Sequence, residues 1–364
     1  MRQNFKLWLA LGAALCCPLT VTSKDNEGDK VRVVSLPDQA MVPDAEVDSD
    51  GVIHVAYFAD DDIYYTKSSD DGKSFSNPLR VNAEAGFASG GAFRGPDIAV
   101  GGDGRVHVVW YNAGYQQKRP KEEWGVMYSR LNAGSLVFEK ARNLNGKPSD
   151  NFSLAADGSG HVAVVWMAGG IFVNSSKDGG KTFAAPVDLK VDPCECCGSR
   201  ALYAKDGVLS VLYRDKADNI RDTYLAQIPS EGTAVSRNLK ISKTPWLITS
   251  CPMTGGFLGR SMGGLIAAWE TKGQIYFASL GEDAEGASGR GPDEIHASKK
   301  GRYPVSLSAP DGKALVAWKD GELLEWQLFD RENQPVGKKG SANSTSKHRP
   351  AGVVTKEGKF LLFP

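Results

Sequence analysis

GRVHVVW, residues 104–110, is one of six copies of a unit that decides the fold. Each copy has a glycine in a turn, a β-rich run, and an aromatic residue six positions after the glycine. The other copies are GVIHVAY (51–57), GHVAVVW (160–166), GVLSVLY (207–213), GGLIAAW (263–269) and GKALVAW (312–318). A repeat of about fifty residues is typical of propeller blades, whose four-stranded sheets bury their faces against neighbouring sheets. We therefore predict an all-β chain folded as a β-propeller.

The number of blades depends on the end of the chain. A weaker seventh copy, GKFLLFP (358–364), lacks the aromatic residue in register. The segment VRVVSL (31–36) could complete this last sheet and so join the N-terminal end of the propeller to its C-terminal end. The sequence favours seven four-stranded blades, with six as the alternative.

The composition and the N-terminal segment limit which classes of protein this chain can belong to. Lysine plus arginine and aspartate plus glutamate each total 43 of 364 residues, which removes the electrostatic case for nucleic-acid binding. Residues 1–17 read as an export signal, because Arg2 and Lys6 precede the apolar run LWLALGAAL (7–15). Residues 18–30 read as a polar linker and residues 31–364 as a single propeller domain.

The predicted location is outside the cytoplasm of a bacterium: periplasmic, extracellular or tethered to the surface. No segment after the signal is apolar enough to span a bilayer. Cys16 or Cys17 could carry a lipid anchor after cleavage, although the small residue expected before such a cysteine is absent. Plain secretion is favoured over the lipid anchor, because a cleavable signal is the commoner case.

Two loops share the pattern S-x-D-x-G-x-x-F. In such a hairpin loop the aspartate accepts backbone hydrogen bonds, the glycine permits a positive φ, and the aromatic ring packs the loop onto the sheet. The pattern is carried by Ser68, Asp70, Gly72 and Phe75, and by Ser176, Asp178, Gly180 and Phe183.

With these two motifs the sequence resembles the sialidase-like family of BNR or Asp-box repeat proteins, over essentially the whole of residues 31–364. The resemblance implies that the boxes are structural and lie on the face opposite the ligand site. It also implies an arginine clamp for a substrate carboxylate, an aspartate acid/base and a tyrosine nucleophile. The matching candidates are Arg94, Asp97, Arg200, Arg302 and Tyr303, with Asp150 as a second candidate acid. The glutamate and tyrosine of the family's catalytic context are missing, so the sequence leaves open whether the chain is an enzyme.

A cluster of sulfur-containing residues is more particular to this chain. Cys194, Cys196 and Cys197 lie in DPCECCGSR, and Cys251 and Met253 lie in SCPMTGG one repeat later. Three cysteines within four residues cannot pair with one another in ordinary geometry, so at most one of them bridges comfortably to Cys251. The others form a strained short-range disulfide, stay reduced or bind a soft metal.

Thiolates and a thioether are soft ligands that select Cu(I), and their spacing does not match a structural zinc site. The C-x-C-C and W-x-I-x-x-C-P-M motifs resemble a subgroup of exported Asp-box proteins. The loop YRDKADNIRD adds polar residues that could orient the site, namely Arg214, Asp215, Arg221 and Asp222.

Both sets of residues are expected at the mouth of the propeller, where connecting loops gather. The first hypothesis is a binding or redox site near blades four and five, holding a soft metal such as Cu(I). The alternative is a sialidase-like exo-glycosidase that acts on acidic sugars. The expected partners are a small anionic ligand, a glycan or a metal ion.

Overall fold

The structure is a computed structural model that describes residues 30–37, 39–112, 118–149, 151–230, 232–281, 292–344 and 348–364. The predicted export signal, nearly all of the linker, and Asp150 lie outside these residues. Within the described ranges, none of the helices has the length and apolarity needed to cross a membrane.

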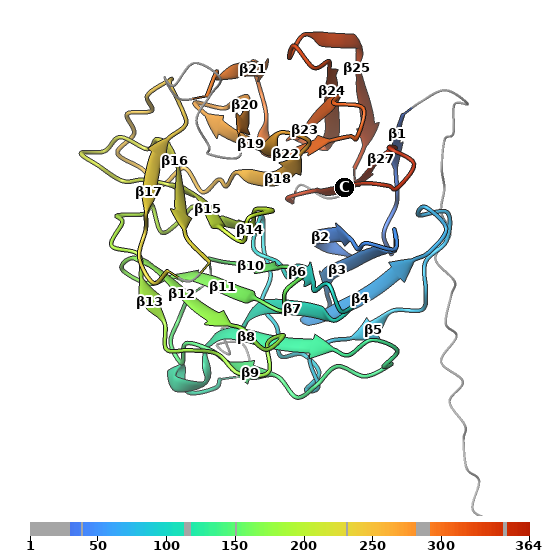
Figure 1. Cartoon of the computed structure of the whole chain (residues 1–364), viewed down its shortest axis with the longest axis vertical. Helices are drawn as coiled ribbons and strands as arrows, with labels where there is room; N and C mark the ends of the chain where they lie inside the picture. The colour runs from blue at the N-terminus through green and yellow to red at the C-terminus, as the bar shows by residue number, and fades with distance from the viewer. Residues whose placement is uncertain are drawn as a thin grey trace, which may run out of the picture.

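Seven sheets are arranged in a ring, with the first strand of each nearest the centre (Figure 1). Consecutive first strands contact one another around the whole ring, and β26 contacts β2 to close it. The predicted all-β propeller with seven blades is therefore confirmed, and the six-blade alternative is wrong.

The first four blades are formed in chain order by β2 (Met41–Val47), β3 (Ile53–Ala59), β4 (Asp62–Ser68) and β5 (Leu79–Arg80); β6 (Asp97–Val100), β7 (Val106–Asn112), β8 (Gly125–Leu131) and β9 (Arg142–Asn143); β10 (Phe152–Ala156), β11 (Val162–Met167), β12 (Ile171–Ser176) and β13 (Val187–Asp188); and β14 (Arg200–Tyr203), β15 (Leu209–Arg214), β16 (Thr223–Ile228) and β17 (Arg237–Lys240). A short 3-10 helix, η1 (Lys121–Glu123), lies between β7 and β8.

The remaining three blades are formed by β18 (Phe257–Ser261), β19 (Gly264–Thr271), β20 (Gln274–Gly281) and β21 (Ile295–Ser298); β22 (Arg302–Ser308), β23 (Ala314–Asp320), β24 (Leu323–Phe329) and β25 (Pro335–Asn343); and β26 (Ala351–Val354), β27 (Phe360–Phe363) and β1 (Val31–Val33).

The last blade has three strands where four were expected. The segment predicted to complete it does so, but β1 pairs in parallel with β27, from Val31 opposite Phe360 to Val33 opposite Leu362. The beginning of the propeller is thereby hydrogen-bonded to its last strand, and the ring is closed by backbone pairing.

The aromatic residue of each repeat fills the space between consecutive blades. Trp110, Trp166, Trp269 and Trp318 are at most 1% exposed, and each packs in a cluster shared with the preceding blade. Burying such a large ring contributes about 1.5–3 kcal/mol relative to leaving it exposed. The repeat aromatics therefore help to hold neighbouring blades together.

The Asp-box loops follow the third strands of blades one and three, as predicted. In the second box, Asp178 Oδ1 accepts from the Thr182 amide at 2.8 Å and from the Ser176 hydroxyl at 2.8 Å. Ser176 Oγ also accepts from the Gly180 amide at 2.9 Å. Phe183 packs edge-on against Tyr128 of the preceding blade, with ring centroids 4.9 Å apart.

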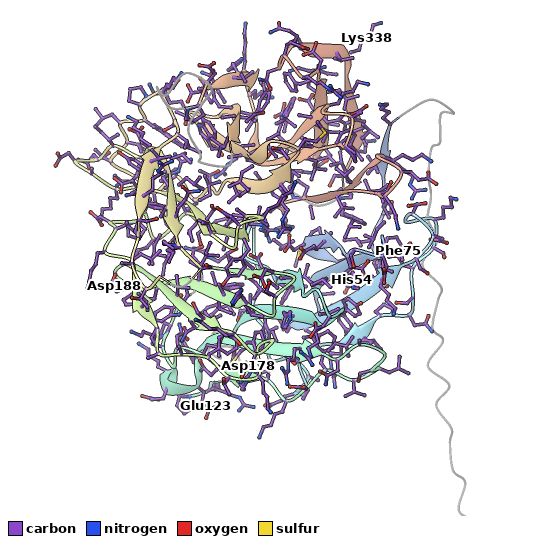
Figure 2. All side chains as sticks on the ribbon, in the orientation of Figure 1. His54, Phe75, Glu123, Asp178, Asp188 and Lys338 are labelled. Carbon is purple, nitrogen blue, oxygen red and sulfur yellow. A yellow bond between two sulfur atoms is a disulfide. The ribbon has the colours of Figure 1, made fainter. Side chains whose placement is uncertain are left out.

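The first box repeats this arrangement. Asp70 Oδ1 accepts from the Ser74 amide and the Ser68 hydroxyl, and Phe75 packs edge-on against Phe363 of the last blade. Phe75 and Asp178 are labelled in Figure 2, where they mark the two box loops. Each aromatic ring thus fastens its loop to the blade before it.

Strand direction separates the loops into two faces of the ring. At one edge of each blade lie the turn between the first and second strands and the turn between the third and fourth strands. The Asp-boxes are at this edge. The turns between the second and third strands and the connections from blade to blade lie at the other edge. We call this second edge the mouth.

Candidate functional site at the propeller mouth

The cysteines lie on two neighbouring connections of the mouth. Cys194, Cys196 and Cys197 lie between β13 and β14, where the chain enters blade four, and Cys251 lies between β17 and β18, where it enters blade five. Adjacent blades bring the two connections together. A disulfide joins Cys196 to Cys251, whose Cα atoms are 6.3 Å apart.

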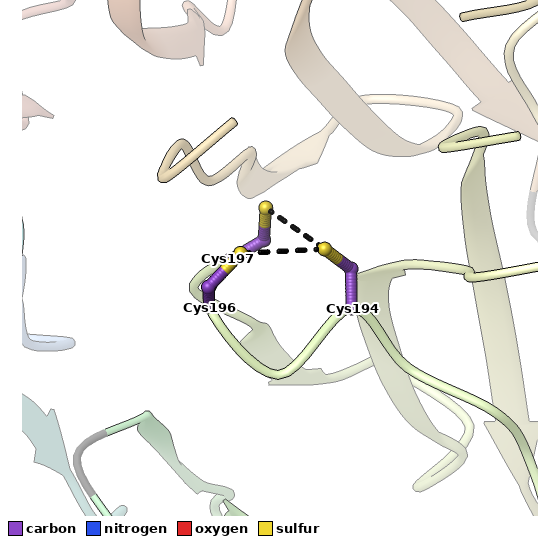
Figure 3. A group of neighbouring side chains, drawn as sticks. All are labelled: Cys194, Cys196 and Cys197. Atoms are coloured by element: carbon purple, nitrogen blue, oxygen red, sulfur yellow. Dashed lines mark hydrogen bonds between the residues drawn. The ribbon is translucent and has the colours of Figure 1, made fainter. Parts of the chain in front are cut away.

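The three sulfur atoms of the first connection form a compact cluster (Figure 3). Cys194 Sγ lies 3.5 Å from Cys196 Sγ and 3.7 Å from Cys197 Sγ, and all three lie within 4.8 Å of one another. Cys194 and Cys197 are free and buried, at 4% and 0% exposed, whereas Cys251 is exposed. The cluster therefore combines two buried thiols with one disulfide sulfur.

A turn sets the direction of these side chains. The Cys197 amide donates to the Cys194 carbonyl at 2.9 Å, and the Cys194 amide donates to the Arg214 carbonyl at 2.7 Å. The turn buries Cys194 and Cys197 and leaves Cys196, between them, half-buried and joined to blade five.

The two free thiols differ in acidity. The hydrogen bond from the Cys197 thiol lowers the pKa of Cys194 to about 6, burial opposes this change, and the nearby Arg221 and Arg214 guanidinium groups support it. The hydrogen bond to Cys194 and burial raise the pKa of Cys197. At neutral pH this arrangement favours a Cys194 thiolate that accepts from a Cys197 thiol.

The loop predicted to orient the site connects β15 and β16 beside the cysteines. Arg214 is 4% exposed; it donates to the Arg221 carbonyl and to the Glu270 carbonyl, both at 2.6 Å, and it stacks over Trp246. The Asp215 amide donates to the Asp222 carbonyl at 2.9 Å. Arg214 thus links the loop of blade four to blade five and brings a positive charge near Cys194.

Met253 lies two residues after Cys251, in a left-handed backbone conformation with φ of 49°. Its side chain is 42% exposed, and its carbonyl accepts from Arg302 at 2.9 Å. The loop is therefore held in place by blade six. A role for its sulfur in metal binding stays a prediction.

The arginine candidates lie nearer the central axis and are paired within the protein. Arg200 donates to Asp44 at 2.7 Å and lies 3.2 Å from Asp97, which also accepts from Arg349 at 3.2 Å. Asp44 and Asp97 are 2% and 3% exposed. Burial raises the pKa of Asp97, and Arg200 opposes the increase. We call these four residues the ionic layer.

The ionic layer lies between two spaces on the axis. On the mouth side is a cavity of about 30 Å³ lined by Arg94, Asp97 and Tyr303; on the other side, Arg200 lines a channel of about 240 Å³. Ligand pockets usually measure about 300–1,000 Å³. The mouth-side cavity is thus too small for a sugar ring in this conformation.

Arg302 is about half-exposed and contacts blade five. Its Nε lies 3.5 Å from Glu270 Oε2, and its guanidinium donates to the Pro252 carbonyl at 2.9 Å. Glu270 in turn accepts from Thr254 at 2.7 Å. The predicted clamp residues Arg94, Arg200 and Arg302 lie around one mouth, but Arg200 and Arg302 are bonded to carboxylates of the protein.

Glu270 was missed by the sequence analysis. The residue that follows the repeat aromatic is apolar or aromatic in the first three blades but is Arg214, Glu270 and Lys319 in blades four to six. All three are buried, at 4% exposed or less. A comparison of this single repeat position could have identified them.

No protein-family model matches the chain, and no curated protein matches it. Among solved structures, a Hadza microbial sialidase is 13% identical with a TM-score of 0.51, covering 77% of this chain and 63% of that one. The NanB sialidase of Streptococcus pneumoniae is 12% identical with a TM-score of 0.51, covering 77% and 65%. The chain therefore spans less than two thirds of the length of these sialidases.

A polysaccharide lyase of family PL25, an ulvan lyase, has a TM-score of 0.52 at 13% identity, covering 87% of this chain and 85% of that one. At such low identity these similarities concern the fold alone. What the chain shares with these proteins is a propeller fold.

Proposed function

We propose that this chain is an exported propeller that binds a soft metal ion of the Cu(I) type through the cysteines of blades four and five. The observation that carries the proposal is the approach of three cysteine sulfurs to within 4.8 Å of one another. Thiolate sulfur is a soft ligand, and soft ligands select Cu(I) over hard cations such as Mg²⁺ and Ca²⁺.

The spacing of the sulfurs suits three-coordinate binding. A metal ion with three sulfurs in one plane at about 2.3 Å holds them about 4.0 Å apart. The two shortest separations in the cluster are 3.5 and 3.7 Å, so small shifts of the side chains would suffice. Cys194, Cys196 and Cys197 would hold the ion, with Cys251 as a further anionic ligand once the disulfide is open.

The charge around the cluster supports this assignment. Several thiolates near one another repel, and buried cations offset that repulsion. Arg214 and Arg221 are 4% and 6% exposed and lower the pKa of Cys194. Cys196 becomes a ligand only after its disulfide opens, and opening also frees Cys251 as a fourth thiolate. Met253 is the neutral sulfur donor nearest in sequence.

The test is a Cu(I) titration of the reduced protein against a competing chelator. Cys251→Ser should weaken binding more than Met253→Leu, because it removes an anionic ligand. Met262→Leu is the matched control, since Met262 is also an exposed methionine, at 56%, and lies in the β18–β19 turn at the opposite edge. Equal Cu(I) affinity in the unmodified protein and in a Cys194→Ser/Cys197→Ser variant would refute the proposal.

A second candidate, hydrolysis of an acidic sugar, would use Arg94, Arg200 and Arg302 as a carboxylate clamp with Asp97 and Tyr303. The arginines around the mouth favour it, because a guanidinium binds a carboxylate through two parallel hydrogen bonds. The ionic layer and the cavity of about 30 Å³ argue against it. We therefore place it second.

A further inference from the structure

A free buried thiol lies in contact with a disulfide. Cys194 Sγ is 3.5 Å from Cys196 Sγ (Figure 3). Cys196 is bonded to Cys251 in a disulfide. Thiol–disulfide exchange begins when a thiolate approaches one sulfur of a disulfide, so the two reacting atoms are already adjacent. The arrangement places nucleophile and target two residues apart on one turn.

We propose that Cys194 exchanges with the Cys196–Cys251 disulfide and thereby transfers the reactive thiol from the buried turn of blade four to the exposed Cys251 of blade five. The proposal rests on the proposed function for its purpose, since the metal site needs the disulfide to be opened and the exchanged form is the one that an incoming thiol reduces more easily. The exchange itself requires no metal.

The step is balanced without an outside oxidant or reductant. Cys194 loses its proton to solvent, and its sulfur attacks Cys196 Sγ. The Cys194–Cys196 bond forms as the Cys196–Cys251 bond breaks, and the electron pair leaves on Cys251 Sγ, which takes a proton from solvent. One disulfide and two thiols are present before and after the step.

The surroundings favour this direction of attack. The Cys197 thiol donates to Cys194 Sγ at 3.7 Å, and the Cys194 amide donates to the carbonyl of the buried Arg214 at 2.7 Å, so Cys194 is held beside the disulfide. The leaving sulfur belongs to an exposed residue, where water solvates the departing thiolate. A disulfide between residues two apart is strained and easily reduced, so the exchanged form is a minor and reactive one.

Native alkylation would trap the exchanged form. Metal-free protein is purified without reductant, treated with N-ethylmaleimide while folded, then denatured, alkylated with iodoacetamide and digested with trypsin. Residues 191–200 carry all three cysteines of the turn, and residues 244–260 carry Cys251. We expect N-ethylmaleimide on Cys251 in the peptide 244–260, and a disulfide within the peptide 191–200. The disulfide-linked pair of these two peptides should decrease as labelling proceeds.

Two serine variants assign the nucleophile. Cys194→Ser should lose the labelling of Cys251 and keep the cross-link. Cys197→Ser keeps a hydrogen-bond donor beside Cys194, so it should still label Cys251, at a reduced rate. Cys194→Ala repeats the test if the serine variant folds poorly. A thiol count in denaturant before labelling should give one disulfide and two thiols, not counting Cys16 and Cys17.

The proposal is overturned if Cys251 stays unlabelled in the unmodified protein, if Cys194→Ser labels it equally, or if Cys194, Cys196, Cys197 and Cys251 are all reduced at the start. Its failure is separate from that of metal binding. Labelling without Cu(I) affinity would support the exchange and refute the proposed function, and Cu(I) affinity without labelling would do the reverse.

Discussion

The substitution Arg200→Met tests whether the ionic layer is structural. Arg200 bonds Asp44 at 2.7 Å and lies 3.2 Å from Asp97, and both carboxylates are at most 3% exposed. Methionine fills similar volume without charge, so Asp44 loses its cation and Asp97 keeps only Arg349. Removing one partner of a buried ion pair costs about 3–5 kcal/mol. We expect the free energy of unfolding to fall by that amount.

The assay is urea unfolding followed by fluorescence, for which the eight tryptophans of the chain provide the signal. Arg260→Met is the matched control, because Arg260 lines the same channel but is 42% exposed and lies 3.7 Å from its partner, Glu46. An exposed pair contributes about 0–1 kcal/mol, so this control should change little.

A double variant identifies the cause of the loss. Arg200→Met/Asp44→Asn removes one of the stranded carboxylates and should recover at least about 1 kcal/mol relative to Arg200→Met alone. The reasoning would be refuted if Arg200→Met were no more destabilising than Arg260→Met. Arg200 would then be free to bind a ligand, and the glycosidase candidate would move to first place.

Three further predictions concern other regions. Asp178→Ala and Asp70→Ala should each lower the unfolding free energy by about 1 kcal/mol, because the loop amides that lose their acceptor are partly solvated. Both variants should keep the Cu(I) affinity of the unmodified protein. A variant that is stable but has lost Cu(I) affinity would contradict this. Burial raises the pKa of Glu46 to about 7, above its unfolded value, so the contribution of Glu46 to stability falls as pH rises from about 4.5 to 7. Glu46→Gln should therefore reduce the difference between the urea midpoints measured at pH 5 and at pH 8. The Glu46 side chain is 24% exposed, so solvent makes this difference smaller than full burial would. A fluorogenic sialoside should not be hydrolysed, and turnover abolished by Arg94→Ala would restore the glycosidase hypothesis.

The repeat was sufficient to predict the propeller because the same physical requirement recurs in every blade. Each buried aromatic, such as Trp110 or Trp166, fills the gap to the preceding sheet, so its position marks the second strand. The three-stranded last blade could not be predicted in detail. The parallel pairing of β1 with β27 depends on how the closed ring brings the two ends together, which the sequence of either segment does not encode.

The candidate site was predictable in composition but not in pairing. Three cysteines within four residues are nearly equivalent in sequence, and the choice of Cys196 as partner of Cys251 follows from the turn closed by the Cys197 amide on the Cys194 carbonyl. The arginines near the axis were identified, yet the bond from Arg200 to Asp44 joins blades four and one across the axis. Contacts across a ring leave no local sequence pattern.

Opening the disulfide should weaken the propeller without unfolding it, a condition on which metal binding by the reduced chain depends. The bridge joins residues 55 apart, and closing a loop of that length contributes up to about 4 kcal/mol through the entropy of the unfolded chain. The interface of blades four and five also has other contacts: Leu212 and Trp269 pack in one buried cluster, and Arg214 donates to the Glu270 carbonyl.

We therefore expect the urea midpoint to fall on reduction, while the near-ultraviolet circular dichroism of the packed tryptophans persists. Cys251→Ser should reproduce the fall and should not respond further to reductant. Collapse of the near-ultraviolet signal on reduction would mean that the bridge, rather than the blade interface, holds this part of the ring together. The cysteines would then be a structural clamp, and a folded metal site built from their reduced forms could not exist.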